Sequence, residues 1–436
     1  MLWVAACGSP QSDGAAVAER PNIVLIISDD HGYGDFGFMG SEVAKTPNID
    51  RLAREGSTFP VTYNTGSLCR PSLISLLTGL DPKQWEVSTA EFARSGPRSR
   101  GKQAIRHFAT LPRVLGKHGY ATFQAGKLWE GNYEMAGFGD GLKTRHATGL
   151  RDTGAWAGGD ESLAVGRTTL APVTDFIDAH VGEPFFVWFA PMLPHTPHDA
   201  PKHYEDRYAD LGLSGRERRY FANVSRLDDA VGALIAHLER RGLRERTLVV
   251  FLADNGWEPE RRDDEQVWVG GAKGKASMFE LGWRTPLVFN WPNAIPAGEV
   301  KPSLVSTLDL FPTLLDYAGA APLPDRPGRS LRPVLDGGDP DIRTALYGSD
   351  RGIRPRERAQ HGPPSAPRAP AFFARSARWH YIWTSETGDD ALYDILEDPD
   401  EEENVATAHP EQVQRFRTEI EAWHEAVQEP LLPPAP

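Results

Sequence analysis

Cysteine, long apolar runs and an excess of basic residues are the features that this sequence has least of. Its 436 residues include two cysteines, Cys7 and Cys69, so one disulfide is the most that could form. That bond would use both thiols, and we do not expect it. No stretch of eighteen apolar residues occurs, which predicts that no helix spans a membrane.

Acidic residues outnumber basic ones, 60 to 47, and the formal net charge is −13. A protein that binds nucleic-acid phosphates normally carries a basic surplus, so this composition argues against nucleic acid as a partner. It favours a small-molecule substrate. The 40% of hydrophobic residues can bury a large core, and the 42 glycines and 36 prolines predict many long loops, where pockets are commonly built.

Continuous apolar runs rich in β-branched and aromatic residues predict strands that are buried on both faces of a parallel sheet. These runs cover residues 22–28, 120–124, 184–189, 247–252 and 286–291. Between them, apolar residues recur at helical spacing, most clearly from Val224 to Leu238. Strand and helix alternate, so we expect an α/β fold with a large, mostly parallel sheet sandwiched by helices.

The composition changes near residue 346. Residues 351–370 are rich in Arg, Pro and Ala and lack periodicity, which predicts an exposed loop. Alternating runs then predict a small antiparallel sheet, followed by a helix from about residue 410 to 427, and the acidic run 397–403 predicts a solvated turn. We therefore expect one domain over 20–345 and a loop insertion with a C-terminal subdomain over 346–436.

Two of the predicted strands end in acidic or amide side chains. Asp29 and Asp30 follow the first strand, and Asp254 and Asn255 follow the strand at 247–252. In a parallel sheet, ligands bind outside the carboxyl ends of the strands, so these four side chains are expected to converge. Buried carboxylates need a compensating cation, and oxygen ligands suit calcium or magnesium better than zinc. The sequence therefore predicts a divalent metal site.

Cys69 stands just before a helical repeat. Pro71 suits the first turn of a helix, and apolar residues at i, i+3, i+4 and i+7 predict one buried stripe. That stripe consists of Leu73, Leu76, Leu77 and Leu80. Cys69 is therefore expected at a helix N-terminus, where the dipole favours anions and charged forms of a side chain.

The stretch Cys69-Arg70-Pro71-Ser72, followed by the leucine-rich helix and Thr78-Gly79, resembles the signature of type I sulfatases of the alkaline-phosphatase-like superfamily. In that family the cysteine is oxidised to formylglycine. The resemblance implies a formylglycine-generating or sulfatase-maturating enzyme as a partner. The family pattern has arginine where this chain has Leu73 and Leu80.

The resemblance also implies roles for other residues. Gly126-Lys127 resembles the motif whose lysine bridges substrate sulfate and formylglycine, and Lys275, in Lys-x4-Glu-x-Gly, resembles a second sulfate-binding lysine. His195, in Pro-His-x-Pro, resembles the histidine that contacts the ester oxygen. His198 and Lys273 compete for these roles, and family spacing favours His195 and Lys275. Calcium would be held by Asp29, Asp30, Asp254, Asn255 and the formylglycine from Cys69.

Trp129 is a further departure. Sulfatases commonly have histidine there, assigned as the base that deprotonates the formylglycine hydroxyl when sulfate is expelled. This chain has no histidine at that position. Whether His31, His107, His146 or another residue replaces it is left open by the sequence.

The N-terminal stretch Val4-Ala5-Ala6-Cys7 resembles the lipobox of a bacterial lipoprotein, with Cys7 as the lipidated residue. Few residues precede it, so either the start codon is placed too far downstream or the match is chance. We take the lipoprotein interpretation, with residues 1–19 as signal remnant and tether. It implies a periplasmic or cell-envelope protein, secreted and tethered to the membrane through Cys7.

Together these features predict a bacterial sulfatase that hydrolyses a sulfate ester of a small molecule or glycan. One alternative is a phosphodiester or phosphonate monoester hydrolase on the same scaffold, because phosphoryl and sulfuryl centres are nearly isosteric. Another is a catalytically silent, metal-dependent glycan-binding lipoprotein, which Leu73 and Trp129 together suggest.

Overall fold

A large sheet runs through the middle of the computed structural model, which describes residues 20–94, 103–142, 161–257, 260–261, 268–269, 273–350, 371–385 and 387–431. Within these ranges the sheet has nine strands, in the order β10-β2-β9-β6-β1-β5-β3-β4, with β11 paired to β2. The strands are β1 (Asn22–Ser28), β2 (Ser57–Tyr63), β3 (Ala121–Gly126), β4 (Asp140–Gly141), β5 (Phe185–Ala190), β6 (Thr247–Ala253), β9 (Arg284–Asn290), β10 (Glu299–Val300) and β11 (Val305–Ser306).

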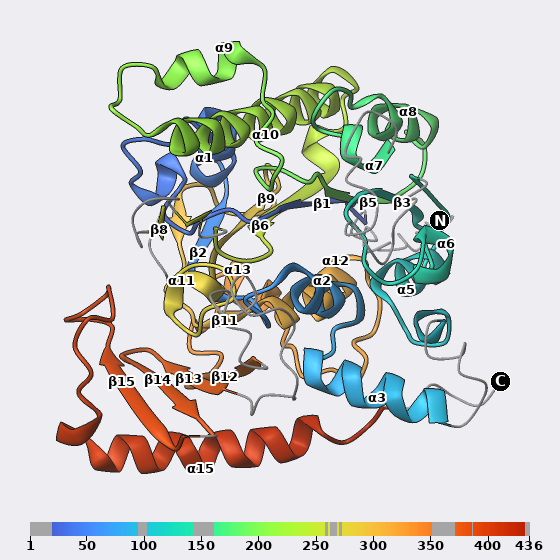
Figure 1. The fold of residues 1–436 in the computed structure, drawn as a ribbon. Helices are drawn as coiled ribbons and strands as arrows, with labels where there is room; N and C mark the ends of the chain where they lie inside the picture. Colours follow the sequence, from blue (N-terminus) through green and yellow to red (C-terminus); the bar gives the residue numbers. More distant parts are fainter. Residues whose placement is uncertain are drawn as a thin grey trace, which may run out of the picture.

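The sheet is mostly parallel, and helices cover both of its faces (Figure 1). In β1, Ile23 and Leu25 point to one face and Val24 to the other, as the two-residue repeat of a strand requires. The first face packs on α2 (Cys69–Thr78), α5 (Leu111–Lys117) and α12 (Leu310–Tyr317). The second packs on α1 (Pro47–Arg54), α8 (Ala171–Ala179) and α10 (Gly215–Arg240). The predicted fold class is confirmed.

The five predicted strands are present as β1, β3, β5, β6 and β9. One of them, β9, runs antiparallel to both of its neighbours, β2 and β6. The strand β2 was not predicted, because its sequence mixes polar residues with Pro60 and lacks a continuous apolar run. The remaining elements are α3 (Pro82–Arg94), α6 (Tyr133–Ala136), α7 (Glu161–Ala164), α9 (Lys202–Glu205), α11 (Glu280–Trp283), α13 (Arg332–Leu335) and a β7–β8 pair (Glu260–Arg261, Trp268–Val269).

A separate antiparallel sheet lies at the bottom of Figure 1, with α15 (Pro410–Val427) along its outer face. Its strands are β12 (Ala345–Asp350), β13 (Ala371–Ser376), β14 (Trp379–Thr384) and β15 (Asp389–Asp394). Phe372 packs toward Phe416 of α15, whereas the next residue, Phe373, packs toward Trp283 beside the large sheet. Residues 351–370, the expected exposed loop, lie outside the described residues, and β12 begins before them at Ala345.

Five buried polar side chains connect the small sheet to the large one, and we call them the sheet-joining cluster: Tyr63, Glu280, Arg375, His380 and Glu401. The Tyr63 hydroxyl and Arg375 Nε each donate to Glu280 Oε1 at 2.6 Å. Glu401 accepts from the backbone N–H of Glu280 at 2.8 Å and pairs with His380. The prediction of a solvated turn over 397–403 is therefore wrong for Glu401, because His380 and the Glu280 amide satisfy its carboxylate in the interior.

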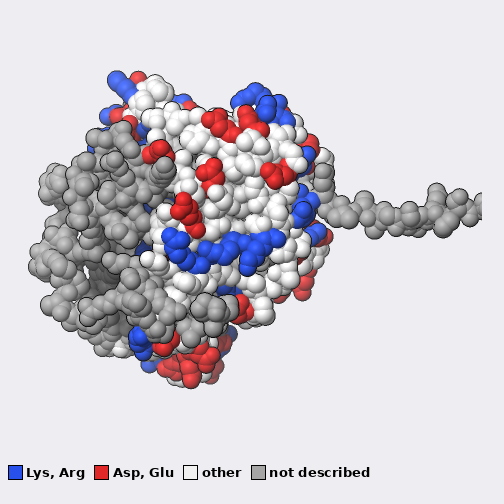
Figure 2. Space-filling view, turned by 90° about the vertical axis from the view of Figure 1, so that its right-hand side faces the viewer, with Lys and Arg blue, Asp and Glu red and all other residues white. Residues whose placement is uncertain are grey.

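The surface of the described residues carries charges of both signs. On the side that lies at the right of Figure 1, Lys and Arg side chains gather in one band, and acidic side chains are scattered around it (Figure 2). The net charge of −13 is therefore not spread evenly. None of the helices in the described part has both the length and the apolar character needed to cross a bilayer.

Candidate active site

The carboxyl ends of β1 and β6 bring four acidic or amide side chains to one place. The two strands pair in parallel, with Ser28 beside Ala253 in the last register position. The residues that follow, Asp29-Asp30 and Asp254-Asn255, are therefore neighbours across the sheet edge. Their contact is direct, since the backbone N–H of Asp30 donates to Asp254 Oδ1 at 3.2 Å.

Cys69 enters this group from α2, of which it is the first residue after the N-cap Leu68. Its Sγ lies 3.5 Å from Asp29 Oδ1 and 3.6 Å from Asp30 Oδ1. Possible ligand atoms of Asp29, Asp30, Cys69 and Asp254 all lie within 4.8 Å of one another. The strand ends and the helix N-terminus thus form one compact cluster, as the sequence predicted.

Burial raises the pKa of the Cys69 thiol well above its ordinary value, although Lys127 and Lys275 oppose this. One expectation about α2 needs correction. The helix has no single buried stripe, because Ser72, Ser75 and Thr78 are as deeply buried as the leucines. The reason is that α2 lies between the large sheet and other helices of the same core cluster.

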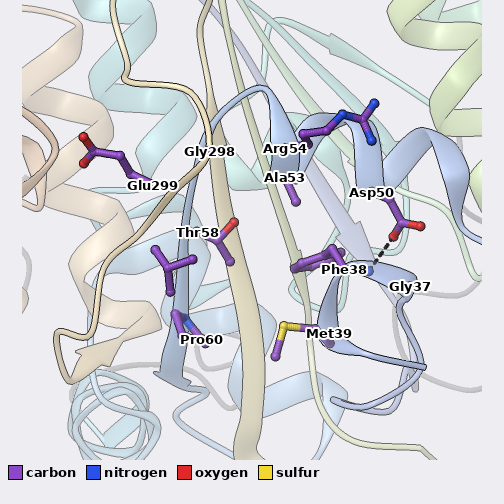
Figure 3. Close-up of a pocket in the computed structure, with 11 residues that line it drawn as sticks. Gly37, Phe38, Met39, Asp50, Ala53, Arg54, Thr58, Pro60, Gly298 and Glu299 are labelled. Atoms are coloured by element: carbon purple, nitrogen blue, oxygen red, sulfur yellow. Dashed lines mark hydrogen bonds between the residues drawn. The ribbon is translucent and has the colours of Figure 1, made fainter. Parts of the chain in front are cut away.

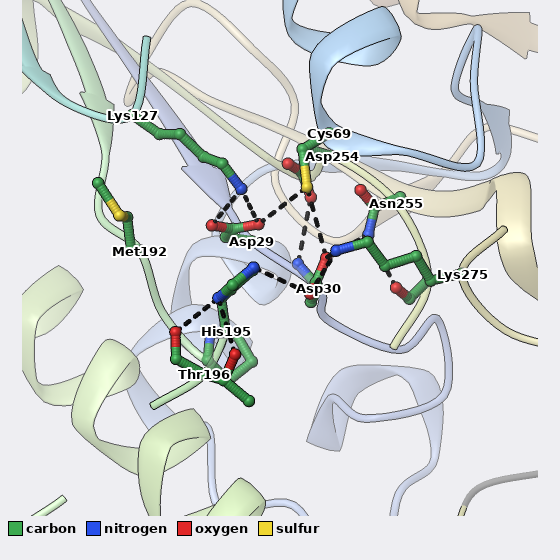
Figure 4. Close-up of polar contacts among 12 residues, drawn as sticks. Asp29, Asp30, Cys69, Lys127, Met192, His195, Thr196, Asp254, Asn255 and Lys275 are labelled. Carbon is green, nitrogen blue, oxygen red and sulfur yellow. Dashed lines mark hydrogen bonds and ion pairs between the residues drawn. The ribbon is translucent and has the colours of Figure 1, made fainter. Parts of the chain in front are cut away.

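Two lysines reach the acids from opposite sides (Figure 4). Lys127, just after β3, places Nζ 2.7 Å from both carboxylate oxygens of Asp29. Lys275 places Nζ 2.6 and 2.7 Å from those of Asp30. Burial alone would lower the pKa of Lys127, but the charge of Asp29 outweighs it and holds this pKa above its usual range. Burial alone would raise the pKa of Asp30, but the nearby Lys275, His195 and Lys127 lower it.

His195 faces the same cluster from the loop after β5. Its Nε2 lies 3.5 Å from Asp30 Oδ2, and its Nδ1 donates to the Thr196 carbonyl at 2.6 Å. Of the competing residues, His198 has its ring 5.8 Å from that of Tyr220, and Lys273 Nζ donates to the Glu401 carbonyl at 3.0 Å.

Two buried oxygen atoms of the cluster fit a bound cation. Asp254 Oδ2 and Asn255 Oδ1 have no hydrogen-bond partner among the described residues, although both residues are fully buried. Asn255 uses its Nδ2 to donate to Asp30 Oδ1 at 2.7 Å, which leaves its amide oxygen available. Burial, together with the negative charge of Asp29, raises the pKa of Asp254 well above its ordinary value. A cation would satisfy both oxygens and reverse this pKa shift.

The departures from the family pattern are also visible in the structure. Leu73 and Leu80 are buried in the apolar core, where they supply no positive charge. The Trp129 ring lies 5.7 Å from Lys127 Nζ, and its Nε1 has no partner among the described residues. His31 is fully buried, and burial lowers its pKa to about 3. His107 packs on Phe92.

Sequence reasoning missed a group of buried polar residues behind the His195 loop. Arg167, Asn223 and Arg226 are buried, and each donates hydrogen bonds to backbone carbonyls in this region. One sequence signal was available, namely polar residues in an apolar helical pattern. Asn223 lies just before the predicted helix over 224–238, and Arg226 lies within it. Their partners lie far away in sequence, so spacing alone could not assign them.

An open groove of about 590 Å³ lies elsewhere, between the first helix and the edge of the sheet (Figure 3). Its lining includes Phe38, Met39, Thr58 and Pro60, and the Phe38 backbone N–H donates to Asp50 Oδ1 at 2.9 Å. None of the cluster residues described above lines it. The chemistry of the protein is therefore assigned to the acidic cluster and not to this groove.

Solved structures with a fold similar to that of this chain include two crystal structures. The crystal structure of Ps i-CgsB in complex with k-i-k-neocarrahexaose has a TM-score of 0.72 at 24% identity and covers 93% of both chains. The phosphonate monoester hydrolase of Agrobacterium radiobacter has a TM-score of 0.65 at 21% identity, covering 94% of this chain and 96% of that one. The chain therefore shares the fold of these solved structures.

Sequence comparison identifies the family to which the chain belongs. The family model described as Sulfatase matches residues 21–320, and one described as N-sulphoglucosamine sulphohydrolase, C-terminal, matches residues 271–426. N-acetylgalactosamine-6-sulfatase of Mus musculus is 33% identical over 387 residues, which cover 79% of this chain and 70% of that protein. This chain belongs to the sulfatase family and is a sulfuric ester hydrolase.

Proposed function

We propose that the chain hydrolyses a sulfate ester of a sugar or other small alcohol, using a formylglycine made from Cys69 and a bound calcium ion. The observation that carries the proposal is the convergence of the acids, Cys69, two lysines and one histidine on a single buried point. A mouse relative named for a sugar sulfate, and a similar structure that holds neocarrahexaose, support a glycan as the alcohol portion.

The cation would be held by Asp29, Asp30, Asp254 and Asn255, together with residue 69. All four side chains offer oxygen atoms, which favours calcium, or magnesium, over zinc. When bound, the ion supplies positive charge that stabilises negative oxygens of the substrate and of residue 69. The two unpartnered oxygens of Asp254 and Asn255 support this assignment.

Lys127 and Lys275 would bind the oxygens of the sulfate group. The raised pKa of Lys127 keeps its ammonium group charged throughout the neutral range. Charge that is fixed in a buried site before the substrate arrives stabilises the transition state without reorganisation. Each lysine thus neutralises an aspartate in the cluster and faces the place where the sulfate would lie.

His195 would protonate the leaving alcohol. Because Nδ1 donates to the Thr196 carbonyl, the proton that can be exchanged is the one on Nε2, the nitrogen that faces Asp30. The Nε2–H bond would break as the proton moves to the ester oxygen, whose bond to sulfur breaks at the same time. Hydrated formylglycine at position 69 would supply two geminal hydroxyl groups, one to attack sulfur and one to expel sulfate, and a thiol offers no such pair.

Mass spectrometry of the Cys69 peptide, purified from the native host, tests the modification directly. We expect the aldehyde form in a substantial fraction of the peptide. Hydrolysis of 4-nitrophenyl sulfate should then be proportional to that fraction across preparations. Complete absence of the aldehyde from a preparation that hydrolyses the ester would overturn the role of Cys69. Unmodified Cys69 with no hydrolysis but retained glycan binding would support the silent binding protein instead.

Phosphonate ester hydrolysis is the second candidate, favoured by the similar fold of a phosphonate monoester hydrolase. The discriminating measurement compares kcat/KM for the sulfate and phosphonate esters of the same phenol, so that only the central atom and its substituents differ. We expect the sulfate ester to be the better substrate. A clear preference for the phosphonate ester would reverse the assignment.

We also propose, from the lipobox-like stretch alone, that Cys7 tethers the protein to the cell envelope. Labelled fatty acid fed to the native host should be incorporated into the protein. The Cys7→Ser variant, expressed in the same host, should lose the label and appear in the soluble fraction. Equal labelling of both forms would contradict the tether.

A further inference from the structure

The loop over residues 192–197 carries His195, and its backbone is held on one side by Asp29, the residue that follows β1. The backbone N–H of Asp29 donates to the Leu193 carbonyl at 2.8 Å, and the N–H of His195 donates to the Asp29 carbonyl at 3.0 Å. These two bonds fix the loop relative to a residue of the acidic cluster. The other carbonyls of the loop take no part in these two bonds.

On the other side, the guanidinium group of Arg167 contacts three of these carbonyls. Its Nη2 donates to the Met192 carbonyl at 2.5 Å and to the His195 carbonyl at 3.0 Å, and Nη1 donates to the Pro197 carbonyl at 3.2 Å. Its side chain is 3% exposed. A planar group with several N–H donors in fixed directions suits this task, and an ammonium group does not.

Asn223 of α10 contacts the same loop. Its Nδ2 lies 3.3 Å from the Pro194 carbonyl, 3.4 Å from that of His195 and 3.1 Å from that of Pro197. The residue is fully buried. The carbonyl of His195 therefore has two side-chain donors from different parts of the chain, Arg167 and Asn223. The N–H of His195 is held separately, by the Asp29 carbonyl.

Arg167 is itself held in place. Arg226 of α10 donates to the Arg167 carbonyl from Nε at 2.9 Å and from Nη2 at 2.6 Å. Asp199 accepts from both arginines, at 3.1 Å from Arg226 Nη1. The ion pairs fix the guanidinium group of Arg167, so its donors act as a rigid support for the loop.

We propose that Arg167 and Asn223 are positioning residues that align His195 with the leaving oxygen of the substrate. The inference rests on the proposed function of His195 as the acid. The side chain of His195 is oriented by the Thr196 carbonyl, which belongs to the same loop, so a shift of the loop backbone turns the ring. The distance between Nε2 and the ester oxygen then depends on donors that never touch the substrate.

The Arg167→Lys variant tests this alignment with two esters that differ in their need for an acid. A sugar sulfate releases a basic alkoxide and needs the proton, whereas 4-nitrophenyl sulfate releases a stable phenolate. We expect kcat for the sugar sulfate to fall by about tenfold or more, with KM little changed, and kcat for the nitrophenyl ester to stay within about threefold. Equal losses on both esters, or no loss, would overturn the proposal.

Arg244→Lys is the matched control. Arg244 is also a buried arginine, but it lies at the opposite end of β6, where its Nη1 donates to the Thr247 carbonyl at 3.0 Å. We expect it to leave the ratio of the two rates unchanged. Asp199→Asn is the milder variant if Arg167→Lys folds poorly, because the Asp199 side chain is 51% exposed. It should reduce the sugar sulfate rate selectively, by a smaller factor.

A measurement that needs no catalysis separates this inference from the proposed function. The ¹⁵N signals of the His195 ring, assigned by comparison with His195→Gln, report its hydrogen bonding. They should shift in Arg167→Lys and remain unchanged in Arg244→Lys. If the wild-type protein hydrolyses neither ester, the proposed function fails, while unshifted His195 signals in Arg167→Lys would refute the positioning role independently.

Discussion

Two buried ionic clusters of this molecule invite comparison. One is the acidic cluster at the ends of β1 and β6, and the other is the sheet-joining cluster. In the acidic cluster, the three carboxylates of Asp29, Asp30 and Asp254 face the two ammonium groups of Lys127 and Lys275. In the sheet-joining cluster, Glu280 and Glu401 face Arg375 and His380, and Arg284 next to the cluster forms a further ion pair with Glu280.

The pKa values of Asp254 and Glu280, one carboxyl group from each cluster, shift in opposite directions. Burial and the charge of Asp29 raise the pKa of Asp254. Burial would also raise the pKa of Glu280, but Arg375, His380 and Arg284 outweigh it and lower this pKa from its ordinary value. Asp254 and Asn255 of the acidic cluster each have a buried oxygen without a partner among the described residues, whereas every carboxylate oxygen of Glu280 and Glu401 accepts a hydrogen bond. We infer that the first is built to bind and the second to hold two sheets together.

The largest expected effect is the loss of activity in Lys127→Met. Removing a buried charge that faces the sulfate should reduce kcat for 4-nitrophenyl sulfate by about 10²- to 10³-fold. Lys202→Met is the control, because the Lys202 side chain is 84% exposed, and its kcat should match wild type. Both rates are to be divided by the formylglycine content from mass spectrometry. Near wild-type activity in Lys127→Met would remove this lysine from the mechanism.

Glu280→Ala should act on stability instead. It leaves the buried Arg375 without its carboxylate partner, which typically costs about 3–5 kcal/mol. Unfolding in urea measures the change in free energy. Glu299→Ala, which removes only the ion pair of the exposed Glu299 side chain with Lys301, should lie within about 0.5 kcal/mol of wild type. A Glu280→Ala protein as stable as wild type would contradict the structural role of the cluster.

Chelation should destabilise the protein through the acidic cluster alone. A ligand present at a hundred times its Kd stabilises the folded state by about 2.7 kcal/mol, so EDTA should lower Tm and calcium should restore it more fully than zinc. The shift should be the same in Glu280→Ala, because the two clusters have separate partners. An unchanged Tm on chelation would remove the cation from this account.

The smallest expected effect concerns Trp129 and the relative rates at which the alcohol and the sulfate are released. The residues proposed for release of the alcohol are present, whereas the usual base for release of sulfate is absent, so the second release should be slower. Stopped-flow measurements on fully modified enzyme should show a burst of alcohol followed by a rate lower by roughly a few-fold or more. Linear release from the first turnover would mean that another residue already supplies the base.

The sequence was most informative where structure depends on local pattern. Uninterrupted apolar runs identified β1 and β6, and the acids that follow them lie together because parallel strands end at the same edge. Resemblance to a family supplied Lys127, His195 and Lys275, which the fold brings to the same point.

What the sequence did not predict depends on distant partners. Glu401 lies in a run of acids that reads as solvated, and its burial follows from His380 and from the amide of Glu280. The support of the His195 loop by Arg167 is equally invisible, since its acceptors are backbone carbonyls, which have no sequence signature. The only local indication of this support was the presence of Asn223 and Arg226, two polar residues, in the apolar pattern of α10.

The burial of Cys69 would set a time limit on the proposed modification. In the finished fold Cys69 is 5% exposed, so under the proposed function a modifying enzyme would have to reach it before the chain closes around it. The loop that carries Lys275 is fixed partly by contacts of Lys273 with the Asp400 and Glu401 carbonyls, which are made 331 and 332 residues later than Cys69 (400 − 69 and 401 − 69). At about 5–20 residues per second, synthesis leaves roughly 17 to 66 s between them. Residues 400 and 401, which follow the last strand of the C-terminal sheet, would thereby set the last moment at which the site can still be assembled around an altered residue 69.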